Sequence, residues 1–151
     1  NPAYLGEPIP AGTRRESWRL KSTLKFGRNT KVQFQADQSE TNNEDNRSYG
    51  YGMSVKLHHS RNGHKVLLHW AGFIVDDYDA RIYVWDVNLP GEMRSQMFYG
   101  TGQSVGLFVK IGTPFGADVS FRVRSTWEFS RYTGEWSLPE VKSGFQMDIA
   151  F

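Results

Sequence analysis

The sequence lacks cysteine, which excludes disulfide bonds and cysteine-based metal or redox sites. It has no run of about 18 consecutive apolar residues, and this excludes a transmembrane helix. Charge of one sign is not in marked excess either, because 18 basic residues accompany 16 acidic ones. This near balance gives no indication of a nucleic-acid surface. The chain starts at Asn1 without a signal-peptide pattern, and we expect it to be the C-terminal portion of something longer.

Aromatic residues and glycine are plentiful. The 151 residues include ten Phe, seven Tyr, five Trp and 15 Gly, although the hydrophobic share is only 38%. This mixture favours β-structure over helix bundles. A polar average is compatible with a membrane barrel, because a lipid-facing strand needs apolar residues only at alternate positions.

Apolar residues recur at every second position along almost the whole chain, which predicts β-strands. In residues 17–26, for example, Trp18 and Leu20 fall on one face and Arg19 and Lys21 on the other. Seven strands are predicted in this way, at residues 17–26, 31–37, 49–60, 64–75, 103–112, 117–129 and 141–151. Most approach the ~9–11 residues that a tilted strand needs to cross a bilayer.

The Asn62-Gly63 pair predicts a two-residue type I′ turn between the third and fourth strands. Such a turn sets Leu57 opposite Leu68, so that the apolar faces of the two strands coincide. A slip of one residue would set apolar against polar positions along the whole ladder. The turn and the alternation therefore predict the same register.

Short and long connections alternate between the predicted strands. The tight turns are "GRNT", "SRNG" and "TPFG", and the longer connections cover residues 38–48, 75–102 and 130–140. Short turns at one end and long loops at the other are typical of an up-and-down transmembrane barrel. We assign the β-rich segment 81–88 to the long outer loop at 75–102. If it spans the membrane instead, the side assignments of the preceding loops reverse.

The end of the chain, "KSGFQMDIAF", resembles the β-signal of bacterial outer-membrane proteins. A polar residue and a glycine precede alternating hydrophobic residues and a terminal aromatic. The resemblance implies recognition by the barrel-assembly machinery through Lys142, Gly144, Phe145, Met147, Ile149 and Phe151. It implies a location in the bacterial outer membrane, with the lipid bilayer as a partner.

The polar faces of the strands would then line a lumen, where water or acidic side chains can satisfy their charges. The lumen-facing candidates are Arg19, Lys21, Lys56, His69, Lys110, Arg122, Arg124 and Glu128. Burying so many charges in the small packed core of a soluble protein would cost considerable free energy. Near the strand ends, Trp18, Trp127, Phe26 and Phe151 fit the aromatic girdles of a membrane barrel.

A narrower resemblance lies in "DDYDARIYVWD" followed by "MFYGTGQSVGLFVKI". Over residues 64–151 the chain resembles the C-terminal region of Bacteroidota-type outer-membrane barrel proteins that carry a helix–hairpin–helix segment before the barrel. The resemblance implies no particular function, and no DNA binding is carried over because the helix–hairpin–helix part is not in this chain. Bacterial single-chain barrels have an even number of strands, from 8 upward. We therefore expect further strands upstream of Asn1 or from other copies.

The histidines do not predict a metal site. His58, His59, His64 and His69 are close in sequence, but alternation puts His58 and His59 on opposite faces and sets His69 beside Lys56. The four side chains are therefore not expected to converge.

Calcium binding and catalysis also find little support. Asp76, Asp77 and Asp79 could supply oxygen ligands for calcium, but they lack the Gly and Glu spacing of an EF-hand, and a solvated acidic loop is the favoured interpretation. No G-x-S-x-G motif is present and no Ser is placed beside a His with an orienting acid. No enzyme activity, cofactor or metal is predicted.

We therefore expect an all-β chain that forms the C-terminal strands of an antiparallel up-and-down transmembrane β-barrel. Residues 1–16 would be a linker, and residues 17–151 the barrel portion with about seven membrane strands. The barrel would be a porin-like channel or a membrane-embedded component of a larger complex with other outer-membrane or periplasmic subunits. The alternative is a soluble β-sandwich that binds carbohydrate through exposed aromatics, namely Trp85, Trp136, Tyr78 or Tyr132.

Overall fold

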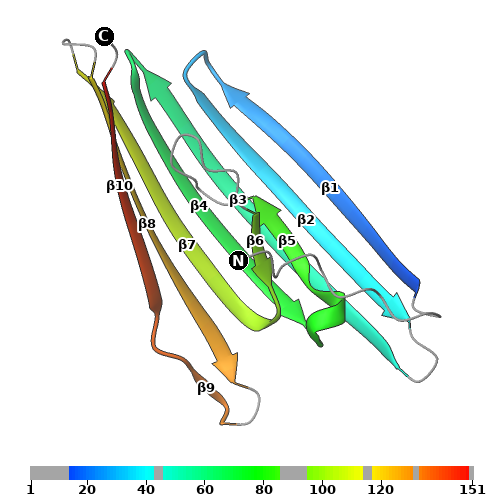
Figure 1. The fold of residues 1–151 in the computed structure, drawn as a ribbon. Helices are drawn as coiled ribbons and strands as arrows, with labels where there is room; N and C mark the ends of the chain where they lie inside the picture. The colour runs from blue at the N-terminus through cyan, green and yellow to red at the C-terminus, as the bar shows by residue number, and fades with distance from the viewer. Residues whose placement is uncertain (1–13, 43–45, 86–94, 114–116, 131–132, 150–151) are drawn as a thin grey trace.

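The computed structural model describes residues 14–42, 46–85, 95–113, 117–130 and 133–149. These residues form one large antiparallel sheet and one small one (Figure 1). The main strands of the large sheet are, in spatial order, β1 (Arg14–Phe26), β2 (Thr30–Asn42), β3 (Arg47–Arg61), β4 (His64–Val75), β7 (Gly100–Gly112), β8 (Ala117–Ser130) and β10 (Glu140–Ile149). The short β9 (Glu135–Trp136) pairs with β8. The expected all-β antiparallel class is confirmed.

The large sheet is an open meander. Each main strand pairs with the main strand that precedes it along the chain. β1 and β10 lie at opposite edges of the sheet, and no pairing between them is present among the described residues (Figure 1). The described strands therefore form a curved wall and do not close into a barrel.

The segment between β4 and β7 forms the small sheet. The 3-10 turn η1 (Tyr78–Ala80) leads into β5 (Ile82–Trp85), which pairs with β6 (Ser95–Phe98). The resulting hairpin lies across one face of the large sheet (Figure 1). Strand structure was expected at 81–88 as part of an outer loop, and the hairpin folds back over the sheet. Among the described residues no helix is long and apolar enough to cross a membrane.

The predicted turn and register are confirmed. Asn62 and Gly63 have φ angles of 50° and 79°, as a type I′ turn requires. Leu57 lies opposite Leu68. Because side chains alternate between the two faces along each strand and the ladders are in register, the face of every side chain in the main strands from β1 to β10 is determined.

Several element bounds differ from the expected ones. Residues 38–48 were expected to be a long polar loop, but β2 continues to Asn42 and β3 starts at Arg47. In this segment both faces of the strands are polar, so the apolar period that marks a strand in the sequence is missing, while backbone pairing continues. β1 also starts at Arg14 and not at Ser17. The expected alternation of short and long connections is therefore weaker than predicted.

The apolar face of the large sheet, here called the outer face, is the exposed one. Trp18 and Leu20 are each 73% exposed, and Phe145 is 67% exposed. The polar face, here called the inner face, carries the hairpin, and its Ser39, Ser104 and other polar side chains are buried. The burial is thus inverted relative to that of a soluble sheet protein.

A small apolar core joins the hairpin to the inner face. Its buried residues are Ala71, Phe73, Val75, Ala80, Ile82, Val84 and Phe98. The rings of Phe73 and Phe98 stack with their centroids 4.3 Å apart. Because Ile82 and Val84 alternate along β5, both side chains point to the sheet. This core covers only the part of the inner face where β4 ends.

We predict that Gly63→Val lowers the free energy of unfolding by about 1–2 kcal/mol, because a β-branched residue is strained at positive φ. Gly63→Asn should cost clearly less, because Asn tolerates this region. Urea titration followed by tryptophan fluorescence would measure both variants. Equal losses in the two variants would contradict the role assigned to the turn.

Candidate functional site

The eight lumen-facing candidates from the sequence all lie on the inner face. Their positions follow from the register, in which inner residues pair with inner residues across each ladder. The central row of this face runs from Lys56 to His69, Gly106, Arg124 and Lys142. The predicted neighbourhood of His69 and Lys56 is therefore confirmed.

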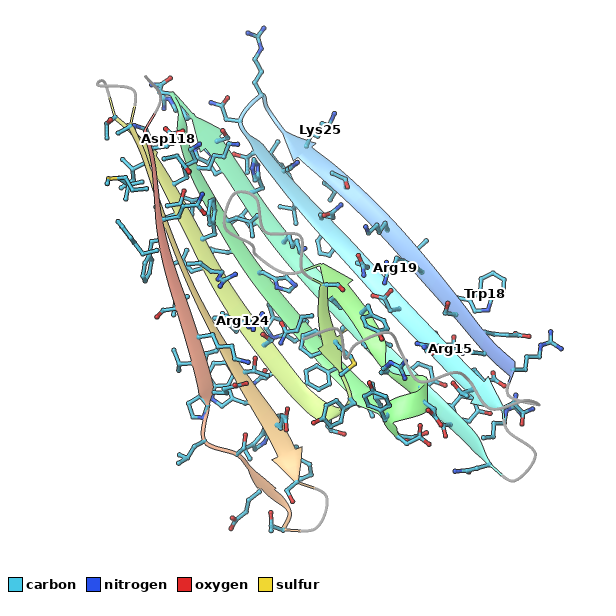
Figure 2. All side chains as sticks on the ribbon, in the orientation of Figure 1. Arg15, Trp18, Arg19, Lys25, Asp118 and Arg124 are labelled. Atoms are coloured by element: carbon cyan, nitrogen blue, oxygen red, sulfur yellow. The ribbon has the colours of Figure 1, made fainter. Side chains whose placement is uncertain are left out.

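Arginines of β1 hold the free edge of the hairpin. Arg15 Nη2 donates to the carbonyl oxygen of Arg81 at 2.6 Å, and Arg19 Nη2 donates to that of Tyr83, also at 2.6 Å. Figure 2 shows both side chains reaching from β1 towards β5. An unpaired strand edge exposes backbone amide and carbonyl groups, and these two hydrogen bonds satisfy two of the carbonyl oxygens. We call this pair the arginine clamp.

A carboxylate positions the clamp. Arg19 Nε lies 2.5 Å from Asp37 Oδ1, and Gln35 Nε2 donates to Asp37 Oδ2 at 2.6 Å. Arg15 Nε also donates to the hydroxyl of Ser39 at 3.3 Å. Asp37 is 8% exposed, so its charge is satisfied by these partners and not by bulk water.

Two glycines let the hairpin approach the sheet. A Cβ atom at Gly50 would overlap the carbonyl oxygen of Ala80, and one at Gly52 would overlap Cδ1 of Ile82. The "YGYG" stretch of β3 therefore places its tyrosines on the outer face, and its two glycines leave the backbone of the inner face without side chains. A side chain at Gly50 would displace the hairpin backbone, and one at Gly52 would displace the Ile82 side chain.

The acidic residues before β5 anchor it as well. Asp77 caps η1 by accepting from the backbone amides of Asp79 and Ala80, and it also accepts from the hydroxyl of Ser48. Asp76 Oδ2 accepts from the backbone amide of Tyr49 at 3.0 Å. These carboxylates bind protein donors, which gives the acidic loop a structural role. Within the described ranges no group of three His, Asp or Glu side chains is arranged to hold a metal ion.

The exposed side of the hairpin carries an arginine between tyrosines. Arg81 Nε donates to the Tyr83 hydroxyl at 2.7 Å, and its guanidinium lies over the Tyr78 ring at 4.3 Å from the centroid. The hydrogen bond to Tyr83 raises the pKa of Arg81. This cluster keeps the β5 edge charged and ordered.

The rest of the inner face is strongly cationic. We call the end of the sheet with the connections 27–29, 62–63 and 113–116 the turn end, and the opposite end the loop end. From the central row to the turn end, the described inner face holds Lys25, Lys31, Lys56, Lys65, Lys110, Arg122, Arg124 and Lys142. Among the described residues this area holds two carboxylates, Asp118 and Asp148, and Asp118 lies 2.5 Å from Lys110 Nζ. One row nearer the loop end, Glu140 lies 2.9 Å from Lys142 Nζ. In Figure 2, Lys25 and Asp118 lie at the end away from the hairpin.

Two buried polar side chains in this area have no hydrogen-bond partner in the part of the chain that the structure describes. His69 is 2% exposed, and neither of its ring nitrogens has a partner among the described residues. The hydroxyl of Ser120, which is fully buried, has none there either. Buried polar groups are nearly always satisfied by protein, water or a ligand. Each of these two groups, which lie in different rows of the sheet, therefore has capacity for a further hydrogen-bonding species.

The outer face carries aromatic residues in two rows. At the loop end, one cross-strand row runs through Trp18, Gln38, Tyr51, Ile74, Thr101, Phe129 and Trp136. At the turn end, Phe26, Phe121 and Phe145 share another row. Of the expected girdle residues, Trp18 and Phe26 fall in these rows, Trp127 lies one row inward from the first, and Phe151 lies outside the described residues.

The outer face also has a hollow near the loop end. It encloses about 660 Å³ and is lined by large side chains that include Trp18, Tyr51, Trp70 and Trp136. The hollow forms because Ala36 and Gly72 lack bulk at its floor. Its lining is mainly apolar, and its few side-chain hydrogen-bonding groups include Gln38 and Gln103.

The expected assembly signal lies on the edge strand β10. Phe145 and Met147 point to the outer face, Lys142 and Gly144 to the inner face, and the second backbone edge of β10 has no partner strand among the described residues. Ile149 ends the strand. Phe151 lies outside the described residues.

No family model, curated protein or solved structure matches this chain. The class of this protein is therefore defined by its fold alone. It is an all-β chain with an open antiparallel sheet, which exposes its apolar face and carries a hairpin on its polar face.

Of the residues that hold the hairpin, the sequence predicts only the face of Arg19. Arg15 falls in the expected linker, although it shares parity with Arg19 and the alternation extends to it. Asp37 is only a polar strand position in the sequence. The hairpin partners of Arg15 and Arg19 come from distant parts of the chain, so no local pattern identifies these contacts.

We predict that Gly52→Val detaches the hairpin. The added side chain needs the space of Ile82, so amide hydrogen exchange in β5 and β6 should accelerate by at least tenfold, which corresponds to about 1.4 kcal/mol of lost docking free energy. Met53→Val, at the exposed position next to it, should leave this exchange within about twofold. Unchanged exchange in Gly52→Val would contradict the close packing.

We predict that the arginine clamp acts through its two carbonyl bonds. Arg15→Met and Arg19→Met should each speed exchange of the β5 amides about fivefold to thirtyfold, because a net hydrogen bond from a charged donor is worth about 1–2 kcal/mol. Lys25→Met removes a charge from the same strand and face at the turn end and is the control. Equal effects of all three variants would show that net charge, and not the clamp, holds the hairpin.

Proposed function

We propose that this chain forms part of an outer-membrane β-barrel, with its outer face against lipid and its inner face towards a lumen. The observation that carries the proposal is the inverted burial. Trp18 and Leu20 are each 73% exposed, whereas Ser104 and His69 are almost completely buried. A large exposed apolar face is rare on a soluble monomer and marks a contact with lipid or protein.

The aromatic rows support lipid as the contact. Membrane barrels have an apolar band about 25 Å tall between two aromatic girdles. Trp18 and Phe26 lie eight residues apart on β1, which is about 27 Å along a strand and about 20 Å of depth at a tilt of about 40°. The side chains between the two rows on the outer face are largely apolar. Both rows therefore fit within the ~25 Å apolar band of one bilayer.

The free edges support closure with further strands. β1 and β10 are long edge strands, and each leaves one row of backbone donors and acceptors without a partner among the described residues. In a bilayer such groups must be paired, because lipid offers no hydrogen bonds. We therefore propose that additional strands, from elsewhere in the protein or from other copies, complete the wall.

The hairpin would then sit in the lumen. It enters from the loop end and covers the inner face with Ile82 and Val84, so it narrows whatever passage the closed wall encloses. On this basis the barrel acts as a channel narrowed by the hairpin or as a membrane-embedded part of a larger complex. The barrel-assembly machinery is the proposed partner for β10.

The soluble sandwich finds less support. Its second sheet should cover the apolar face, whereas the described hairpin covers the polar one. Trp136 lines the outer hollow and Tyr78 lies on the hairpin, so these two candidate stacking residues do not form one site. Tyr132 and the side chain of Trp85 lie outside the described residues. A carbohydrate would need more hydrogen-bonding groups than this hollow supplies.

The direct test is fractionation of the full-length protein after carbonate washing of membranes. We expect retention in the outer-membrane fraction and release only by detergent, because the outer face needs an apolar solvent. A monodisperse monomer that needs no detergent would refute the proposal.

A matched pair of arginine substitutions tests which solvent the outer face meets. Leu68 is 43% exposed, so Leu68→Arg should be nearly neutral in water but should cost about 2–4 kcal/mol against lipid. Gln33→Arg, on the inner face one row away, should cost less than about 1 kcal/mol. Urea titration in lipid vesicles would measure both variants, and equal small losses would favour an aqueous outer face.

A further inference from the structure

The cationic half of the inner face has a centre around Gly106. Across β4, β7 and β8, Gly106 separates His69 from Arg124, and Lys56 lies on the other side of His69. Neighbouring strands are about 4.8 Å apart, so the backbones of His69 and Arg124 are about 10 Å apart, and the sheet position between them is a glycine. Figure 2 shows Arg124 extending from β8 over this face.

His69 gives this centre an unfilled hydrogen-bonding capacity. It is 2% exposed, and both ring nitrogens are without a partner among the described residues. A neutral imidazole offers one donor and one acceptor, and a guanidinium offers a planar fork of donors that suits phosphate or carboxylate oxygens. The group that can accept from His69 and Arg124 together, beside Lys56, is an oxyanion.

The wider charge distribution favours the same ligand. Beyond Lys56 and Arg124, six Lys and Arg side chains surround this centre on the turn-end half of the inner face, against Asp118, Asp148 and the Glu140 that pairs with Lys142. The described carboxylates of the hairpin segment, Asp76, Asp77 and Asp79, lie at the other end. A surface lined mainly with one sign of charge concentrates solutes of the opposite sign.

We infer that the inner face binds an oxyanion solute, of the phosphate-bearing class, at a site formed by Lys56, His69 and Arg124 over Gly106. The inference rests on the proposed function in one respect, since the barrel makes this face a lumen and the ligand a solute within it. The cations nearer the turn end attract the anion towards the site. The hairpin restricts its movement from the site to the loop end.

Binding of inorganic pyrophosphate to the full-length protein in zwitterionic detergent tests the site. Isothermal titration calorimetry should give saturable binding that weakens as salt is raised. Arg124→Gln and His69→Phe should each raise the dissociation constant by tenfold or more. Lys25→Gln and Lys31→Gln remove cations from the same face near the turn end, and they should change it by no more than about threefold.

The outcomes separate the site from the barrel. Equal weakening by all four variants would overturn the site and leave only a diffuse positive field. Membrane retention without pyrophosphate binding would overturn the inference and leave the proposed function intact. Pyrophosphate binding by a protein that needs no detergent would overturn the proposed function and leave the binding site intact. Binding of short-chain phosphatidic acid without pyrophosphate would identify a lipid headgroup as the source and overturn the assignment to a solute.

Discussion

The backbone hydrogen-bond ladder of the large sheet is the interaction on which the other features depend. Because each main strand pairs in register with the next, the parity of a residue on β1 fixes the side of the sheet for its partners as far as β10. The ladder thereby gathers aromatic residues into two rows on the outer face and cations into one half of the inner face. Neither grouping exists within any single strand.

The inverted burial follows from what covers each face. The hairpin brings a small apolar core to the polar face, and it does so over Gly50 and Gly52, where the backbone has no side chains to displace. The clamp from Arg15 and Arg19 then satisfies carbonyl oxygens on the free edge of β5. The hairpin is therefore held by close packing at its centre and by hydrogen bonds from charged arginines at its edge. This combination suits an element that must stay ordered against a polar wall.

Charge is also sorted along the strands. At the loop end, Asp77 caps η1 and Asp37 pairs with Arg19, so these carboxylates stabilise the fold. Cations outnumber carboxylates towards the turn end, and two buried polar groups there, those of His69 and Ser120, lack partners among the described residues. Stability alone does not favour such an arrangement, because like charges repel and buried polar atoms are costly to leave unpaired. Binding of an anion would offset both costs.

The sequence by itself determined the seven main strands, the register at Asn62-Gly63 and the face of each lumen candidate, because a period of two and a turn type are local properties. It did not determine where β2 ends, because both faces of residues 38–42 are polar and leave no period to read. The hairpin's place on the inner face, the arginine clamp and the centre around Gly106 were decided only by the tertiary structure. They depend on residues such as Arg15 and Arg81, or His69 and Arg124, that are far apart in the chain and meet only when the ladder and the hairpin have formed.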